Sequence, residues 1–511
     1  MDNVAYNPGA LARLSTLLGA PEAALRLLAS ILLGFPVALL HRYTLYGKDP
    51  TRQHIFFIAC GLAIGYWNYG NSVERYLNLQ RIKRHARARV FSYTKNNFDA
   101  YSLFADYNVL HSSTAVCVTY MLLKILGSTG LLVIVTFLFN MSYLLYGYYT
   151  TSTQDYDIKW TMPQCVLTLR LIGLAFNLWD GKKHDTKLSD SQKRVALKEQ
   201  PSLLEIAAYT YFPGAFLIGP QFSMRRYLDF VSSRFSERDP ITGTAKLPDC
   251  ISAGLSRAFV GFIYVAIFQI GTLYVSDQYF FEPSFQKLNL IKKCLLIGLW
   301  GRINLYKYVS VWLITEGVCI TFGLTYNGKD SEGRVKWDGC ANVKLRTFET
   351  STQFNHYILS FNINTNHWCA EYIYKRLKFL GSKMRSQLMT LLFLALWHGF
   401  HSGYYHCFFM EFVIMYFERD IGPALQNSEK VQTLLKTRWE ARLLAWIFLK
   451  LYTFVFMGYC LVSFILLSYP RYNEVYANLY YFGHVFFFSY PLLAPYIKRL
   501  IDQRHEHQRS Q

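Results

Sequence analysis

The chain has 511 residues, of which 52% are hydrophobic and only 17% are charged. A soluble protein of this length carries about 25% charged residues, so the composition argues against a soluble multidomain protein. The 53 basic residues exceed the 33 acidic ones, which leaves a net charge of +20. These basic residues are scattered between apolar blocks, which disfavours nucleic-acid binding. They fit cytoplasmic loops of a membrane protein, or attraction to anionic lipids or a phosphorylated cosubstrate.

The apolar residues gather in long blocks, and several blocks approach the roughly 20 residues that a helix needs to cross a bilayer. We therefore predict an all-α polytopic membrane protein with about ten or eleven transmembrane helices in one integrated unit. The blocks are residues 24–40, 55–67, 131–149, 166–178, 207–218, 259–275, 295–322, 388–416, 443–467 and 479–497.

The polar segments divide the chain into three parts. Residues 1–22 form a short lead-in, 23–498 the membrane unit and 499–511 a polar tail. The lead-in lacks the pattern of a cleaved signal, so the first helix is expected to act as an anchor. Within the unit, residues 73–108 are basic and too polar to be buried, which indicates a solvated loop or an interfacial helix.

Two breaks interrupt the hydrophobic stretch from residue 207 to residue 222. Pro213-Gly214 and Gly219-Pro220 both disfavour a continuous helix. Irregular backbone at membrane depth survives only against protein or a wet cavity. We therefore predict that this segment forms the wall of a cavity.

The stretch from Ser360 to Phe412 holds the candidate chemistry. His398 lies inside the apolar block 388–416, where an ionisable side chain is a functional hypothesis by default. If that block is one helix, His398 shares a face with His401, Ser402 and Tyr405. A structural role for His398 in the core stays open on these grounds alone.

The sequence lacks the motifs of several other kinds of catalytic or metal site. The 13 histidines form no second cluster in an apolar context, which disfavours a di-iron site, and no metal is expected. His406 is followed five residues later by Glu411, not by the Asp of soluble acyltransferases. A Gly-x-Ser-x-Gly nucleophile elbow is also absent. The ten cysteines include no CxxC pair, so neither a zinc site nor a disulfide framework is expected.

Six stretches carry a resemblance to a known family. Asn362 precedes the Trp397-His398-Gly399 motif, with His398 lying 36 residues further along the chain. This spacing resembles the asparagine–histidine pair of the membrane-bound O-acyltransferase family, and the chain is most similar to its lysophospholipid branch. The matching stretches are residues 156–163, 201–205, 219–224, 337–342, 360–366 and 396–404.

The resemblance implies a helical bundle around a substrate tunnel in the endoplasmic reticulum membrane. It implies transfer of a fatty acyl group, expected to be unsaturated, from acyl-CoA to the sn-2 hydroxyl of lysophosphatidylcholine and related lysophospholipids. Acyl-CoA is then a cosubstrate, and no cofactor is expected. His398 carries over as the catalytic histidine and Asn362 as its partner. Further candidates for substrate contact are Trp397, His401, Ser402, Tyr405 and Asn364, with Lys375, Arg376 and Lys378 for the CoA phosphates.

The chain departs from the family pattern in two places. Residues 73–108 look like an insertion, and the C-terminal residues 504–511 lack a dilysine retrieval signal. Two alternatives stay open. One is a family acyltransferase with a sterol, diacylglycerol or protein acceptor, and the other is a multipass transporter with His398 as a proton relay.

Overall fold

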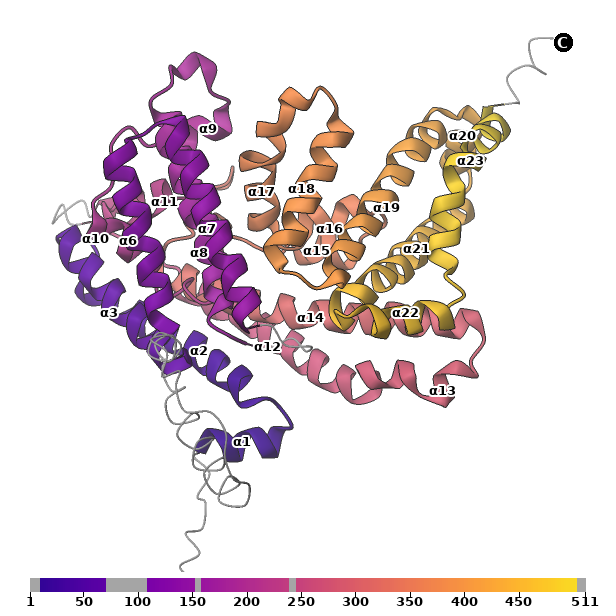
Figure 1. Ribbon diagram of the computed structural model, residues 1–511, viewed down its shortest axis with the longest axis horizontal. Helices are drawn as coiled ribbons and strands as arrows, with labels where there is room; N and C mark the ends of the chain where they lie inside the picture. The colour runs from indigo at the N-terminus through magenta and orange to yellow at the C-terminus, as the bar shows by residue number, and fades with distance from the viewer. Residues whose placement is uncertain (1–9, 70–107, 152–157, 239–244, 503–511) are drawn as a thin grey trace, which may run out of the picture. The chain divides into compact units, whose positions relative to one another are not determined.

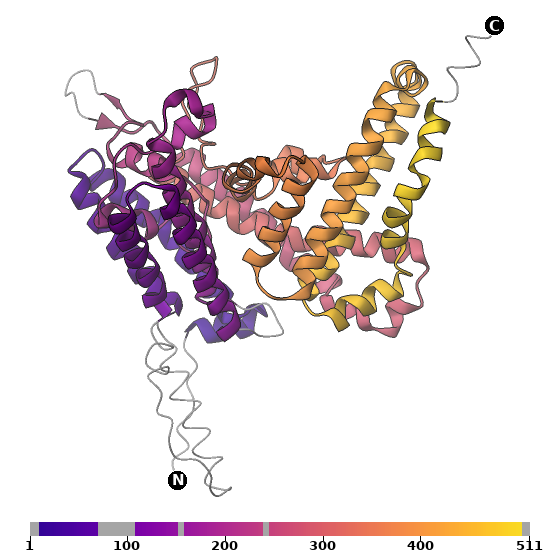
Figure 2. The same ribbon diagram turned by 45° about the horizontal axis from the view of Figure 1, so that its top comes forward.

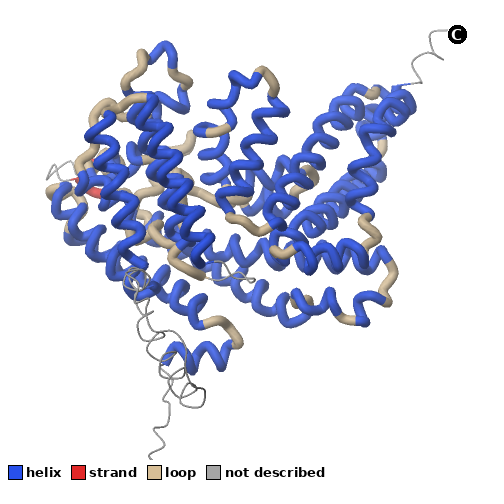
Figure 3. Tube along the Cα trace, viewed as in Figure 1, coloured by secondary structure: helices blue, strands red, loops and turns tan. Residues whose placement is uncertain are grey.

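The computed structural model describes residues 10–69, 108–151, 158–238 and 245–502. Helices make up nearly all of the regular structure in these ranges (Figure 3), which confirms the predicted all-α class. The described residues also include one antiparallel pair of two-residue strands, β1 (Glu237–Arg238) and β2 (Ala245–Lys246). Apart from Asn108, the predicted insertion at 73–108 lies outside the described residues.

The chain divides into two compact units, and the first comprises Met1–Thr151, Asp157–Val260 and Val311–Ala341. Its helices α6, α7 and α8 run side by side (Figure 1), and Asn140 of α7 donates a hydrogen bond to Thr119 of α6 at 3.2 Å. The elements of this unit are α1 (Ala10–Leu18), α2 (Glu22–Thr44), α3 (Pro50–Tyr69), α6 (Asn108–Leu126), α7 (Gly130–Thr151), α8 (Thr161–Gly181), η1 (Asp185–Lys187), α9 (Asp190–Val195), α10 (Leu203–Thr210), α11 (Met224–Val231), β1 and β2.

The second unit comprises Ser152–Tyr156, Gly261–Ser310 and Asn342–Gln511. Its helices α19, α21 and α23 run side by side (Figure 2), and Phe487 of α23 packs against Phe417 and Phe456 at 5.5 and 4.7 Å. The elements are η2 (Asp277–Phe281), α13 (Pro283–Gln286), α15 (Leu345–Glu349), α16 (Phe354–Ser360), α17 (Ile363–Tyr372), η3 (Tyr374–Leu380), α18 (Lys383–His398), α19 (Ser402–Asn427), α20 (Glu429–Thr437), α21 (Trp439–Leu466), α22 (Tyr469–Asn478) and α23 (Phe482–Asp502). Two helices, α12 (Ile251–Tyr274) and α14 (Leu290–Phe322), are each divided between the two units, and a further boundary falls between Ala341 and Asn342.

Five helical segments of the described residues are long and apolar enough to cross a membrane. They are Glu22–Thr44, Gly130–Thr151, Thr161–Gly181, Ile251–Phe281 and Trp439–Leu466. The protein is therefore a polytopic membrane protein. The larger number of ten or eleven spans stays a prediction, because several apolar blocks form shorter or interrupted helices. The predicted unit boundary at residue 498 falls inside α23, which ends at Asp502.

The break predicted near Pro213 is confirmed. Helix α10 ends at Thr210, and the next helix begins only at Met224. The intervening backbone is largely buried, so its carbonyl groups need donors. Arg170 of α8, which is 2% exposed, supplies them. Its guanidinium donates at 2.7–3.2 Å to the carbonyl oxygens of Tyr209, Thr210, Ala215 and Pro220.

Replacing Arg170 with alanine should destabilise the first unit. A hydrogen bond to a charged group contributes about 1.5–3 kcal/mol, and Arg170→Ala leaves four buried carbonyl groups without this donor. We expect a loss of more than about 3 kcal/mol in the free energy of unfolding, seen as a large drop in the thermal midpoint and yield of detergent-solubilised protein. The matched control is Arg194→Ala, because Arg194 is exposed on α9. Equal midpoints for the two variants would contradict this role.

Candidate active site

The candidate residues lie on a helical hairpin in the second unit. Helices α17 and α18 run side by side and are joined through η3 (Figure 1). Trp368 of α17 stacks on Phe393 of α18 with ring centroids 5.8 Å apart. Trp368 comes six residues after Asn362, and Phe393 comes five residues before His398. At 1.5 Å of rise per residue, the hairpin therefore brings Asn362 and His398 to the same open end.

Asn362 stands immediately before α17 in a left-handed conformation, with φ 50° and ψ 43°. Asparagine tolerates this region better than most residues. Its Oδ1 accepts a hydrogen bond from Nδ2 of Asn342 at 3.5 Å. Within the described residues its own Nδ2 has no protein acceptor, so it can donate to a substrate oxygen. The backbone thus presents an amide donor at the start of the helix.

Asn342 is a residue that sequence reasoning missed as a member of the site. It is 3% exposed, and its Oδ1 accepts from the backbone N–H of Asn364 at 3.0 Å. Its carbonyl oxygen accepts from the N–H of Ile363 at 3.1 Å. Together with an antiparallel bridge between Val343 and Phe361, these bonds hold the turn that carries Asn362. The available signal was the position of Asn342 at the end of the matching stretch 337–342.

His398 is the last residue of α18, and aromatic rings surround its imidazole. The rings of Tyr404 and Phe408 lie 5.3 and 5.5 Å away, centroid to centroid. Phe464 of α21 and the neighbouring Trp397 pack edge-on at 5.1 and 4.7 Å. In the part of the chain that the structure describes, neither imidazole nitrogen has a hydrogen-bond partner. A neutral imidazole in this setting can accept a proton from a bound hydroxyl.

The prediction that His398 lies on one face of a continuous helix with His401, Ser402 and Tyr405 is wrong. Helix α18 ends at His398, and α19 begins at Ser402. Gly399 between them has φ 127°, a conformation that side chains with a Cβ rarely adopt and that stops the helix. His401 and Tyr405 are therefore not placed relative to His398 by the 3.6-residue repeat. The long apolar run hid this break because only Gly399 marks it.

The other candidate residues near the Trp397-His398-Gly399 motif differ in burial and in hydrogen bonding. Ser402 Oγ accepts from the hydroxyl of Tyr472 at 3.2 Å, while His401 and Tyr405 are half-buried. Trp397 is buried beside His398. The side chain of Asn366, which belongs to the same polar cluster as Asn362 and Asn364, donates instead to backbone carbonyls at the end of α16.

The basic candidates lie on η3, at the closed end of the hairpin. Lys375 pairs with the buried carboxylate of Glu371, and Arg376 Nε donates to the Glu371 carbonyl at 3.4 Å. Lys378 is exposed. Hairpin geometry thus separates these cations from the end that carries His398.

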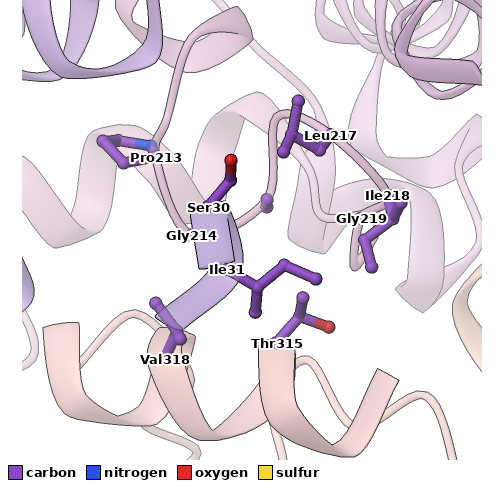
Figure 4. A pocket seen from close by; sticks show the side chains of 10 residues that line it. Ser30, Ile31, Pro213, Gly214, Leu217, Ile218, Gly219, Thr315 and Val318 are labelled. Carbon is purple, nitrogen blue, oxygen red and sulfur yellow. The ribbon is translucent and has the colours of Figure 1, made fainter. Parts of the chain in front are cut away.

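The broken segment after α10 lines a small pocket in the first unit (Figure 4). The side chains of its wall are mostly apolar, with hydroxyls only from Ser30 and Thr315. The prediction that this segment forms a cavity wall is confirmed. The lining residues are Ser30, Ile31, Pro213, Gly214, Ala215, Leu217, Ile218, Gly219, Thr315 and Val318.

Comparison with known proteins identifies the family. Residues 145–463 match the model of the membrane-bound O-acyltransferase family. The chain is 41% identical over 498 residues to lysophospholipid acyltransferase 5 of Mus musculus, covering 97% of this chain and 93% of the relative. It is 41% identical over 482 residues to lysophospholipid acyltransferase 5 of Drosophila melanogaster, covering 92% and 86%. A lysophospholipid acyltransferase of Schizosaccharomyces pombe is 26% identical over 345 residues, covering 66% of each chain.

The chain belongs to the membrane-bound O-acyltransferase family. This membership favours an acyltransferase over the transporter alternative.

Close packing of α19 on α21 should be essential for activity. A Cβ on Gly403 would lie 2.0 Å from the carbonyl oxygen of Ser463, so Gly403→Ala must push the helices apart. Because Tyr404 and Phe464 both pack on His398, we expect at least about a 10-fold loss of turnover in purified enzyme. The control is Gly422→Ala on the same helix, where a Cβ meets nothing within 4 Å. Similar activities for both variants would contradict the expectation.

Proposed function

We propose that this protein transfers a fatty acyl group from acyl-CoA to the free sn-2 hydroxyl of a lysophospholipid, and so remodels membrane phospholipids. The observation that carries the proposal is the open end of the hairpin. There the ring nitrogens of His398 have no hydrogen-bond partner among the described residues, and Asn362 offers an amide donor. The relatives in mouse, fly and fission yeast, which are named lysophospholipid acyltransferases, support the acceptor class.

Within this branch we propose the role of lysophosphatidylcholine acyltransferase 3, acting in the endoplasmic reticulum on lysophosphatidylcholine with unsaturated acyl-CoA. The support is the set of matching stretches, above all residues 219–224 and 360–366. No cofactor or metal is part of the proposal. The second candidate is a family acyltransferase with a sterol or diacylglycerol acceptor. It differs from the first in the acceptor but not in the chemistry.

The proposed reaction needs one base and one oxyanion donor. His398 takes the proton of the sn-2 hydroxyl while the hydroxyl oxygen attacks the thioester carbonyl carbon. The carbonyl oxygen gains negative charge, which the Asn362 amide stabilises through a hydrogen bond. The carbon–sulfur bond then breaks, and the CoA thiolate takes the proton from the imidazolium. Binding both substrates together supplies proximity, so no covalent acyl-enzyme is needed.

Substitution of His398 should abolish transfer without unfolding the protein. General base catalysis contributes on the order of 10²–10⁴ in rate, so His398→Ala should lower turnover by at least 10²-fold. The assay measures phosphatidylcholine that membranes form from lysophosphatidylcholine and oleoyl-CoA labelled in the oleoyl group, with protein amount and monodispersity measured in parallel. The control is His184→Ala, because His184 is an exposed residue. Turnover above a tenth of wild type in His398→Ala would refute the role of His398 as the general base.

The same assay tests Asn362 and the acceptor. Asn362→Ala should lose about 10²- to 10³-fold in turnover, which is typical for removal of one oxyanion donor. Unchanged turnover would remove Asn362 from the reaction. Replacing the lysolipid with diacylglycerol or cholesterol distinguishes the two candidate functions. A higher rate of product formation with either of these acceptors would overturn the lysophospholipid assignment.

Neutralising the basic residues of η3 tests the site for CoA phosphates. We propose that Lys375, Arg376 and Lys378 bind these phosphates, so the triple change to glutamine should raise KM for acyl-CoA about 10-fold with kcat nearly unchanged. Lys378→Gln alone leaves the Lys375–Glu371 pair intact and should give a smaller increase in the same direction.

The control for this series is Lys430→Gln with Lys436→Gln on α20, since both lysines are exposed in the same unit. If the η3 variants and the α20 variants have equal KM values for acyl-CoA, the η3 cations serve only as a positively charged loop.

A further inference from the structure

A chain of four polar side chains connects α19, α21 and α23 in the second unit. Nδ1 of His406 lies 2.9 Å from Oγ of Ser463, and its Nε2 lies 2.8 Å from Nε2 of His484. Nδ1 of His484 in turn lies 2.5 Å from the hydroxyl of Tyr459. Neither histidine is part of the proposed reaction.

One assignment of protons satisfies every member of this chain. The hydroxyl of Tyr459 donates to Nδ1 of His484, and Nε2–H of His484 donates to Nε2 of His406. Nδ1–H of His406 then donates to Ser463, whose hydroxyl donates to the carbonyl oxygen of Cys460 at 3.3 Å. Both rings are neutral in this arrangement. Loss of either ring leaves a half-buried nitrogen of the other without its partner, which is costly.

Aromatic packing fixes the plane of the first ring. The ring of His406 stacks on Tyr472 at 5.4 Å and packs against Tyr476 at 5.1 Å. The hydroxyl of Tyr476 donates to the carbonyl oxygen of Tyr459 at 3.0 Å. Helix α22 therefore closes over the histidine pair and limits how α19 and α21 can shift.

The residues next to this chain are those that surround His398. Ser463 precedes Phe464, whose ring packs on His398. Tyr404 and Phe408 lie two residues before and after His406, and both rings also pack on His398. The polar chain thus holds together the two helices that supply these aromatic contacts.

We propose that His406 and His484 are positioning residues that set the orientation of the His398 imidazole through α19 and α21. The inference deepens the proposed function, because it rests on His398 being the general base. A misplacement of about 1 Å in a reacting group can lower a rate by about 10²-fold, so small shifts of these helices have large consequences.

The test compares His484→Leu, which removes the hydrogen-bonding groups, with His484→Gln, which keeps a polar donor and acceptor near the position of Nε2. Wild type, these two variants, His406→Leu and the double leucine variant are purified in detergent and assayed with oleoyl-CoA and lysophosphatidylcholine. Ser463→Ala is added because it removes one link and keeps the backbone contact with Gly403. Rates are divided by the amount of monodisperse folded protein.

We expect each leucine variant to lower kcat about 10-fold while KM for either substrate changes less than 2-fold. The double variant should be no slower than either single variant, because the two rings act as one unit. His484→Gln should recover at least a third of wild-type kcat, and Ser463→Ala should lose about 3-fold. A role in stability alone would lower the yield of folded protein and leave kcat per folded enzyme unchanged.

Unchanged kcat in the leucine variants, or equal kcat for His484→Gln and His484→Leu, would overturn the inference. If the leucine variants do not fold, Ser463→Ala and His484→Gln test the positioning role instead. A wild-type kcat in Ser463→Ala then contradicts that role. His398→Ala in the same series separates the two proposals. Turnover above a tenth of wild type in His398→Ala refutes the catalytic assignment. A 10²-fold or greater loss in His398→Ala beside unchanged His406 and His484 variants refutes only the positioning role.

Discussion

Backbone groups buried in a membrane protein must find partners within the protein, and much of this structure follows from that constraint. The clearest case is Arg170, whose guanidinium donates to the last two carbonyl oxygens of α10 and to two carbonyl oxygens of the irregular segment that follows it. With these carbonyls satisfied, the segment between Thr210 and Met224 can stay non-helical and line a pocket (Figure 4). Among the residues that the structure describes, this buried charge has backbone carbonyl groups as partners and no acidic side chain.

The same requirement decides which asparagine in the candidate site is available for chemistry. Asn366 donates its amide to carbonyls at the end of α16, and Asn342 binds the backbone of the turn. Asn362 has its oxygen held by Asn342, and its amide N–H groups have no acceptor among the described residues. Asn342, Asn362 and Asn366 therefore have different surroundings, because each side chain meets a different set of polar groups.

The proposed base depends on packing between helices more than on its own helix. Gly399 ends α18 at His398, so the imidazole is enclosed by rings from α19 and α21. Gly403 allows these two helices to approach closely, and the pair His406–His484 connects them to α23. A residue at a helix end has few constraints from its own backbone, so the rings packed around His398 are its main structural contacts.

Local sequence patterns predict the helical membrane class, the family resemblance, the break near Pro213 and the pairing of His398 with Asn362. Apolar block length, proline and glycine positions and short motifs are local properties, so they can be read without coordinates. Other features become visible only in three dimensions. The block 388–416 is divided between two helices, and Asn342 donates a hydrogen bond to Asn362. Arg170 donates to carbonyl groups of the broken segment, and His406 lies within hydrogen-bond distance of His484. Those outcomes depend on contacts between residues far apart in the chain, such as 57 positions for His406 and Ser463, and no local pattern specifies which distant groups will meet.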